Sequence, residues 1–133
     1  MKLLDTTFLI HYWAGVDAVE SYLTEHDEEA FVTTTLNIKE LAVGVELRDD
    51  VAPEEIVPTF EWVEIRPFRT EHALVAGALE AAFHRDDGTN REELDALVAD
   101  LLIAAVAIEE GATVVTRNTE DFERFENLDV EAY

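Results

Sequence analysis

The amino-acid sequence predicts an α/β protein with a three-layer α/β/α architecture and a small, mainly parallel central sheet. Short apolar or β-branched segments alternate along the chain with longer segments of helical periodicity. Strands that alternate with helices form parallel sheets that are covered on both faces. The 133 residues contain no internal repeat or low-complexity segment, so we expect a single domain over residues 1–133.

The first half of the chain is predicted to contain two strands and three helices. In the second of these helices Val19, Tyr22 and Leu23 recur at helical spacing. The second strand is rich in β-branched residues, which favour extended backbone. The strands are expected at residues 2–4 and 31–34, and the helices at 8–13, 16–25 and 36–47.

The second half is predicted to contain a loop, two longer helices and three more strands. Pro53 and Pro58 interrupt regular structure, so residues 51–60 are expected to form a loop with a short helix. Thr70 is a suitable N-cap for a helix that ends near His84, and Gly111 is the residue type that commonly follows a helix end. The other elements are a strand at 63–68, a loop at 86–90, a long helix at 94–110 and strands at 113–116 and 128–130.

The chain is unusually acidic. It has 31 Asp and Glu residues against 9 Lys and Arg residues, which gives a formal net charge of -22 at pH 7. A hydrophobic content of 48% along the chain argues against an acidic disordered segment. We expect a halophilic protein instead, because at about 1 M ionic strength the Debye length falls to ~3 Å and the self-repulsion is screened. Charge alone disfavours nucleic acid as a partner, unless the medium is very salty or metal ions bridge carboxylates to phosphates.

The sequence shows neither a membrane span nor a signal peptide. No apolar run approaches the roughly 18 residues of a membrane helix, and the N-terminus lacks a basic start followed by a long apolar run. We therefore expect a cytoplasmic protein without membrane contact. Because the chain has no cysteine, any metal must be bound by oxygen or imidazole ligands.

Asp100 is the most informative residue of the sequence. It is the only polar side chain in the segment ALVADLLIAAVAI, residues 96–108, which predicts a helix that is apolar on nearly every side. An isolated buried carboxylate costs several kcal/mol unless it is paired or binds a metal. Asp100 is therefore a candidate metal ligand, although an internal ion pair with an arginine or a cap on a neighbouring helix would also explain it.

Glu40 repeats this pattern on another predicted helix. Leu36, Val43 and Leu47 stand four residues before it and three and seven residues after it, so we expect Glu40 to lie within an apolar stripe that faces inward. The alternative is a glutamate at the margin of a buried face, paired with Lys39 or an arginine.

Asp5 follows the first predicted strand directly. It is a good N-cap for the helix that follows. In open α/β sheets, however, ligands bind beyond the carboxyl ends of the strands, where Asp5, the hydroxyl group of Thr7 and Asn118 after the fourth strand are expected to meet.

Three such carboxylates without a matching set of inward cations suit Mg²⁺ or a similar hard divalent ion. A bound ion of this kind supports phosphodiester hydrolysis, because it polarises the phosphoryl oxygen, activates water and offsets charge on the leaving oxygen. The histidines show no ligand spacing, and we expect them on the surface or on helix faces; they are His11, His26, His72 and His84.

Four segments in order resemble the motifs of PIN-domain nucleases. They are LLDTTFLI at residues 3–10, NIKELAVG at 37–44, ADLLIAA at 99–105 and VTRNTEDF at 115–122. The chain is most similar to the VapC toxins of bacterial and archaeal toxin–antitoxin pairs, and the similarity covers nearly its whole length.

This resemblance implies a PIN-like fold and an endoribonuclease that uses Mg²⁺ or Mn²⁺. It also implies a homodimer held inactive by a small VapB-type antitoxin. Asp5, Glu40 and Asp100 match the three principal acids of the family, and they are the expected metal ligands and catalytic residues. Of the remaining matched positions, Thr7 and Thr116 support the first acid, Asn118 stands where many members have a fourth acid and others Asn, and Asp121 is available to assist.

Other functions remain open at the level of the sequence. The chain could be a catalytically inactive PIN-fold interaction module, or a nuclease that acts on DNA. A haloacid-dehalogenase-like phosphatase requires a second Asp where Thr7 stands, and a receiver domain requires a late Lys, so the sequence argues against both.

Overall fold

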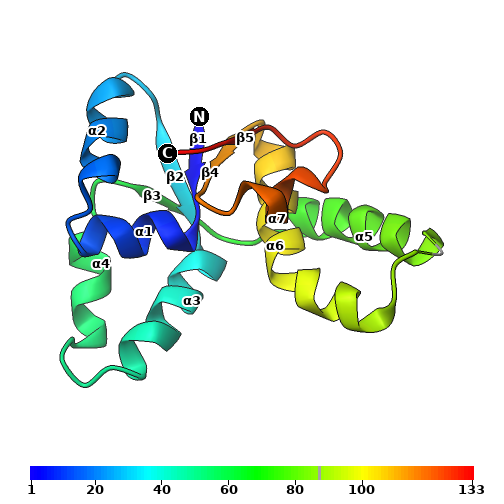
Figure 1. Ribbon diagram of the computed structural model, residues 1–133, viewed down its shortest axis with the longest axis horizontal. Helices are drawn as coiled ribbons and strands as arrows, with labels where there is room; N and C mark the ends of the chain where they lie inside the picture. The colour runs from blue at the N-terminus through cyan, green and yellow to red at the C-terminus, as the bar shows by residue number, and fades with distance from the viewer. Residues whose placement is uncertain (87) are drawn as a thin grey trace.

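The computed structural model describes residues 1–86 and 88–133 and has a five-stranded, fully parallel sheet at its centre (Figure 1). The strands lie in the order β3-β2-β1-β4-β5, so the first strand of the chain is central. All five predicted strand positions are occupied. The strands are β1 (Lys2–Leu4), β2 (Phe31–Thr34), β3 (Glu64–Arg66), β4 (Thr113–Val115) and β5 (Val130–Glu131).

Helices cover both faces of the sheet, which confirms the predicted three-layer α/β/α architecture. The helices α1 to α4 pack on one face and α5 to α7 on the other. Their bounds are α1 (Thr6–Trp13), α2 (Asp17–Glu25), α3 (Thr35–Glu46), the short 3-10 helix η1 (Pro53–Glu55), α4 (Ile56–Thr59), α5 (Thr70–Arg85), α6 (Arg91–Glu110) and α7 (Thr119–Glu123).

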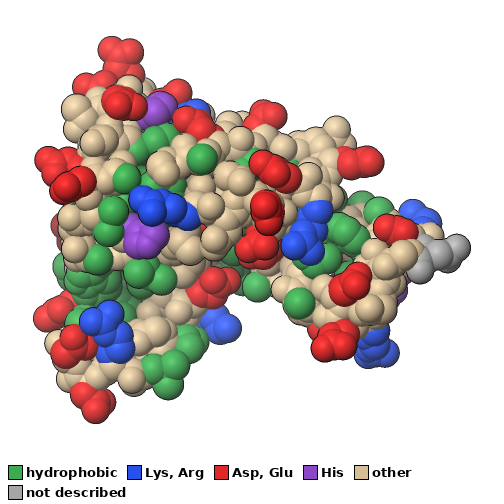
Figure 2. All heavy atoms as spheres, in the orientation of Figure 1, with side chains coloured by type: hydrophobic (Ala, Val, Ile, Leu, Met, Phe, Trp, Pro, Cys, Tyr) green, Lys and Arg blue, Asp and Glu red, His purple; other side chains and the backbone are tan. Residues whose placement is uncertain are grey.

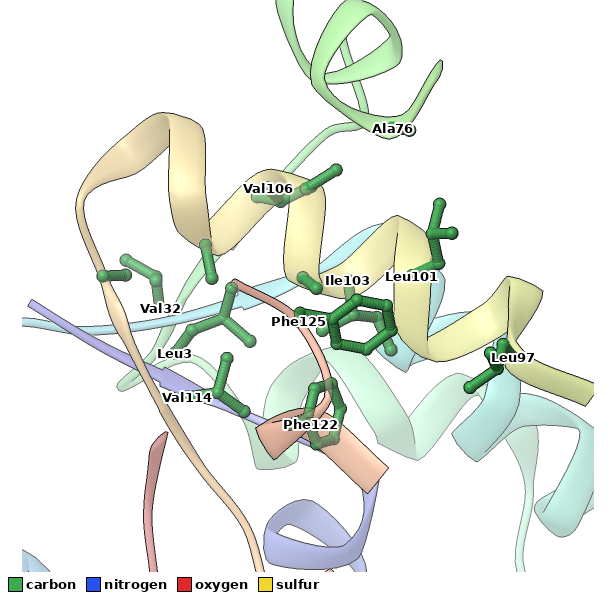
Figure 3. Packing of buried hydrophobic residues seen from close by; sticks show 14 residues of the cluster. Leu3, Val32, Ala76, Leu97, Leu101, Ile103, Val106, Val114, Phe122 and Phe125 are labelled. Carbon is green, nitrogen blue, oxygen red and sulfur yellow. The ribbon is translucent and has the colours of Figure 1, made fainter. Parts of the chain in front are cut away.

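Alternation along the strands divides the core in two. Successive strand residues point to opposite faces, so Leu3 and Val114 belong to one hydrophobic cluster and Leu4 and Val115 to the other. Figure 3 shows the first cluster, in which Leu3 and Val114 lie between the sheet and the side chains of α6, beside Phe122. Because the central strands are buried on both faces, consecutive apolar residues occur in them, as in Leu3-Leu4 and Val114-Val115.

The sheet register brings three strand ends together. Leu3 is paired with Val32 of β2 and with Val114 of β4, and the backbone N–H of Asp5 donates to the carbonyl oxygen of Val115 at 3.3 Å. The residues that follow β1 and β4 therefore lie at the same edge of the sheet, as predicted.

Several boundaries differ from the sequence prediction. The helix α6 begins three residues early, at Arg91, because Asn90 caps it by accepting a hydrogen bond from the N–H of Glu93 at 2.8 Å. Thr70 is the first residue of α5 and not its cap. Gly111 ends α6 with a left-handed φ of 67°, as expected. Of the predicted loop at 86–90, residue 87 lies outside the described residues.

Two features were not predicted at all. The five-residue helix α7 is too short to produce a periodic signal. His72 is wholly buried, contrary to the expectation for the histidines: its Nδ1 accepts from the N–H of Arg69 at 2.9 Å and its Nε2 lies 3.2 Å from Glu110 Oε1. Through these two contacts the imidazole ring of His72 connects the start of α5 to the end of α6. Among the helices of the described residues, none is long and apolar enough to span a membrane.

Candidate active site

Asp5 lies at the carboxyl end of β1 and is only 5% exposed. It caps α1, because its Oδ1 accepts from the N–H of Phe8 at 3.0 Å and from the hydroxyl group of Thr7 at 2.7 Å. Its Oδ2 accepts from the hydroxyl group of Thr116 at 2.5 Å. Burial raises the pKa of Asp5, and the hydrogen bonds from Thr116, Thr7 and Phe8 act in the opposite direction.

Thr116 forms the floor of the site. Its side chain is fully buried after β4, where it donates to Asp5 and accepts from the backbone N–H of Asn118 at 3.0 Å. Asn118 itself is exposed, and in the part of the chain that the structure describes its side chain makes no hydrogen bond that caps α7. The amide group of Asn118 is thus available at the edge of the site.

Glu40 is half-buried on α3 and is held by a chain of hydrogen bonds. Its Oε2 accepts from the hydroxyl group of Thr6 at 2.8 Å, and the oxygen of Thr6 accepts from Asn37 Nδ2 at 3.1 Å. Asn37 is fully buried and completes the capping box of α3. This chain fixes the side chain of Glu40 on the side of α3 that faces α1.

The predicted reason for the position of Glu40 was wrong. Val43 is 46% exposed and Leu47 is 82% exposed, so two residues of the expected inward stripe face outward, while Leu36 packs against the core. The buried face of α3 is formed by Asn37, Leu41 and Val45. Glu40 lies at the margin of that face, but among residues 1–86 and 88–133 it pairs with neither Lys39 nor an arginine.

Asp100 is half-buried on α6 and faces other carboxylates. Burial, followed by the negative charges of Asp121, Glu40 and Asp5, raises the pKa of Asp100 to about 6, while Arg124 acts in the opposite direction. The first part of α6 is less buried than the sequence predicted, because the side chains at 96 and 99 are exposed. The inward position of Asp100 is nevertheless confirmed.

No cation neutralises this cluster directly. In the described ranges 1–86 and 88–133, none of Asp5, Glu40 and Asp100 forms an ion pair. Arg124 pairs instead with Asp121, at 3.6 Å. Figure 2 shows acidic side chains in a line across the middle of one face, above a hollow between the α3 side of the molecule and the α5–α6 side. The arrangement concentrates like charge, which Arg124 offsets only in part.

The donor chemistry of the cluster suits a hard divalent ion, since carboxylate and amide oxygens are the ligands that Mg²⁺ and Mn²⁺ prefer. The placement is not that of a closed chelate: within the residues that the structure describes, no three carboxylate or imidazole side chains are close enough to hold one ion. Both oxygens of Asp5 and one oxygen of Glu40 accept hydrogen bonds from threonines. An ion shared by all three acids therefore requires them to approach one another more closely than they do in this structure.

Sequence reasoning missed Thr6 and Asn37, which hold Glu40. The sequence does contain one signal for Asn37, because Thr34 and Asn37 have the spacing of a helix capping box. It also missed Tyr133, whose ring packs on Phe8 with centroids 4.8 Å apart. No periodic pattern marks that residue.

Comparison with known proteins places these residues in a family. The PIN domain family matches residues 2–128. A protein of Rickettsia bellii named Ribonuclease VapC is 26% identical in an alignment that covers 96% of this chain and 92% of that protein.

Solved structures agree on the fold. The structure of VapBC2 from Rickettsia felis bound to a promoter DNA fragment has a chain that is 24% identical, with a TM-score of 0.81 and coverage of 99% of this chain and 98% of that one. DNA-bound VapBC from Salmonella typhimurium has a chain that is 24% identical, with a TM-score of 0.76 and coverage of 98% and 96%. With its parallel sheet, its acidic strand-end site and a family match over almost its entire length, the chain belongs to the PIN domain family.

Proposed function

We propose that this chain is a divalent-metal-dependent endoribonuclease and the toxin of a VapBC-type toxin–antitoxin pair. The observation that carries the proposal is the group formed by Asp5 after β1, Glu40 on α3 and Asp100 on α6, none of which forms an ion pair among the described residues. The similarity to a protein named Ribonuclease VapC supports RNA as the substrate.

Asp5, Glu40 and Asp100 would hold Mg²⁺ or Mn²⁺. When bound, the ion supplies a Lewis acid for the phosphoryl group and an activated water. Thr7 and Thr116 fix the orientation of the Asp5 carboxylate through their hydroxyl groups.

Glu40, Asn118 and Asp121 would have further roles next to the metal. Thr6 holds Glu40 where its second oxygen can orient the attacking water. Asn118, exposed beside Thr116, would bind a water or a phosphate oxygen, and Asp121 adds negative charge next to Asp100.

The test is cleavage of single-stranded RNA in concentrated KCl, with Mn²⁺ and with EDTA, by the wild-type chain, Asp5→Asn and Asp100→Asn. Asp95→Asn is the matched control, because Asp95 is exposed on the same helix as Asp100. We expect the two site variants to lose Mn²⁺-dependent cleavage and to keep their circular dichroism spectra. Full activity in either site variant would refute the assignment, and preferential cleavage of DNA of the same sequence would favour the DNA-directed alternative.

An apolar groove supports the antitoxin as partner. It has a volume of about 380 Å³, lies between α1 and α3, and is lined mainly by Ile10, Trp13, Leu41, Gly44, Val45 and Val51, with Glu40 at its edge. A segment bound there would extend to the acidic site, so one partner could fill the groove and block the carboxylates. The homodimer is part of the same proposal, and light scattering of the purified chain tests it.

A catalytically inactive interaction module is the second candidate. The observation in its favour is that no three potential ligands converge on one point among the described residues. Such a module would bind no divalent ion at Asp100, whereas the nuclease must.

A further inference from the structure

Arg117 is an exposed arginine next to the candidate active site. It directly follows Thr116, which donates to Asp5. Like four other basic side chains, Arg117 forms no ion pair in the described part of the chain. Its guanidinium group lies instead over the ring of Tyr133, at 5.0 Å from the ring centroid.

Tyr133 is a fixed support for this guanidinium group. Its ring stands edge-on to Phe8, with an interplanar angle of 66°. Its hydroxyl group is 2.5 Å from His11 Nδ1. Contacts on the ring and on the hydroxyl group hold Tyr133 in one place, and Tyr133 in turn restricts Arg117 through a cation–π contact.

The supported arginine adjoins the first acid of the site. Thr7 donates to Oδ1 of Asp5 at 2.7 Å. Thr7 and Asp5 are both near enough to Tyr133 to influence the pKa of its hydroxyl group. Figure 2 shows a basic side chain and a histidine side by side over α1, on the same face as the line of acidic side chains.

The guanidinium group of Arg117, stacked on the ring of Tyr133, is suited to bind a phosphate group. A guanidinium group is planar, stays charged and binds phosphate oxygens with two parallel hydrogen bonds, and stacking on a ring reduces the freedom it loses on binding. The line of carboxylates beside it repels a polyanion, so a nucleic-acid strand needs a cationic contact next to the reacting phosphodiester.

We propose that Arg117, positioned by Tyr133, binds a backbone phosphate of a single-stranded nucleic acid next to the phosphodiester that the carboxylate site cleaves. The proposal rests on the nuclease function proposed above and adds a subsite to it. Arg117 is the binding residue, and Tyr133 is a positioning residue. A purely structural arginine, present only to offset the charge of the site, would contribute to stability and not to nucleic-acid affinity.

The experiment measures the affinity of a fluorescent single-stranded RNA by anisotropy in EDTA, where no cleavage occurs, over a series of KCl concentrations. The proteins are the wild-type chain, Arg117→Ala, Arg117→Lys, Tyr133→Leu and the control Arg85→Ala. Arg85 is exposed at the end of α5, on the far side of the molecule from α1 in Figure 1. Thermal unfolding of each variant is recorded in parallel, and KM and kcat are measured with Mn²⁺.

For Arg117→Ala we expect affinity to fall roughly tenfold or more, as for the loss of a hydrogen bond to a charged group. The slope of log affinity against log salt should become shallower by about 0.7, the value for one lost contact with a single strand. Arg117→Lys keeps the charge and should keep the slope, Tyr133→Leu should weaken binding by a few-fold, and Arg85→Ala should change nothing. In the cleavage assay KM should rise while kcat stays within about twofold of wild type, as when uniform binding is lost.

Two results would overturn the subsite: no RNA binding by the wild-type chain, or equal affinity and slope in the wild type and Arg117→Ala. A large loss of thermal stability in Arg117→Ala with unchanged affinity identifies the structural role instead. If binding depends on Arg117 but the wild type cleaves neither RNA nor DNA with Mn²⁺, the subsite stands and the nuclease proposal fails.

Discussion

Asp5 combines two roles that the sequence presented as alternatives. It caps α1 through Oδ1 and is held by Thr116 through Oδ2. Burial raises the pKa of Asp5, while the hydrogen bonds that it accepts favour the ionised form and fix the direction of the carboxylate. A fixed direction is what a metal ligand requires. The hydrogen bond by which Asp5 caps α1 therefore also helps to orient a carboxylate of the candidate site.

Thr116→Val removes the hydroxyl group that donates to Asp5 with little change in volume. The variant should lose about 1–2 kcal/mol of stability, because a buried carboxylate loses a charge-assisted hydrogen bond. Its Mn²⁺-dependent cleavage should fall roughly 10- to 100-fold, as for other groups that orient metal ligands. Urea unfolding and initial rates measure the two effects. Wild-type activity in a variant that is destabilised would show that Thr116 serves the fold alone.

Asp100→Asn should stabilise the protein at pH 7 in EDTA. The pKa of Asp100 is raised to about 6 from an ordinary value of about 3.9, so the folded state loses stability as the pH rises through this window and the ionised form carries the cost. Removing the charge should recover about 1 kcal/mol, after allowance for the partial exposure of the side chain.

The gain should disappear near pH 4, where Asp100 is protonated in the folded wild type. Thermal unfolding at both pH values measures it, with Asp95→Asn as the control. A variant that is less stable than the wild type at pH 7 would contradict the view that Asp100 is retained for function at a cost to the fold.

At the scale of elements, the sequence predicted the strands and the long helices but not which face of α3 is buried. Alternation of apolar segments and the apolar run of α6 are strong signals. Leu36, Val43 and Leu47 also have helical spacing, but such spacing cannot distinguish a core face from an apolar face that remains exposed. The exposure of Val43 and Leu47 leaves apolar surface beside the α1–α3 groove.

The site was predicted where it depends on strand ends and missed where it depends on tertiary contacts. Asp5 and Thr116 follow the paired parallel strands β1 and β4. Their proximity was predictable because the carboxyl ends of parallel strands lie at the same edge of a sheet. The bond between Thr6 and Glu40 joins residues 34 positions apart, and the contact of Tyr133 with His11 joins residues 122 positions apart. Neither pair is marked by a local pattern.

Gly44→Leu tests the groove as the antitoxin site. Among the described residues, no atom outside its own helix turn lies within 4 Å of a Cβ built at Gly44, so leucine should enter the groove without straining α3 and should favour the helix. We expect wild-type or higher thermal stability and at least roughly tenfold weaker binding of a co-expressed VapB-type antitoxin.

Gly77→Leu is the matched control, because Gly77 lies within α5 and has equally open space at its Cβ among the described residues. Affinity is measured by titration of the separated partners. Equal antitoxin affinity in the two variants would place the partner elsewhere.

For the whole molecule, the balance of 31 acidic against 9 basic residues dominates the electrostatics. Six ion pairs that do not depend on a protonated histidine lie among residues 1–86 and 88–133 and involve only part of this charge. The remaining repulsion acts over about 10 Å at 0.1 M salt and over about 3 Å at 1 M. We therefore propose that the fold is adapted to concentrated salt.

Stability should rise with KCl between about 0.1 M and 2 M, because screening removes repulsion in the folded state. Urea unfolding at each concentration gives the free energy of unfolding. Equal or greater stability at the lowest salt concentration would reject salt adaptation, and it would also restore the electrostatic objection to a nucleic-acid substrate.

The central claim is that Asp5, Glu40 and Asp100, which form no ion pair among the described residues, are the ligands of a divalent cation. Calorimetric titration with Mn²⁺ in the absence of substrate tests this claim most directly. We predict saturable binding by the wild type and Asp95→Asn, and its loss in Asp5→Asn and Asp100→Asn. No Mn²⁺ binding by the wild type, or undiminished binding by Asp100→Asn, would contradict it.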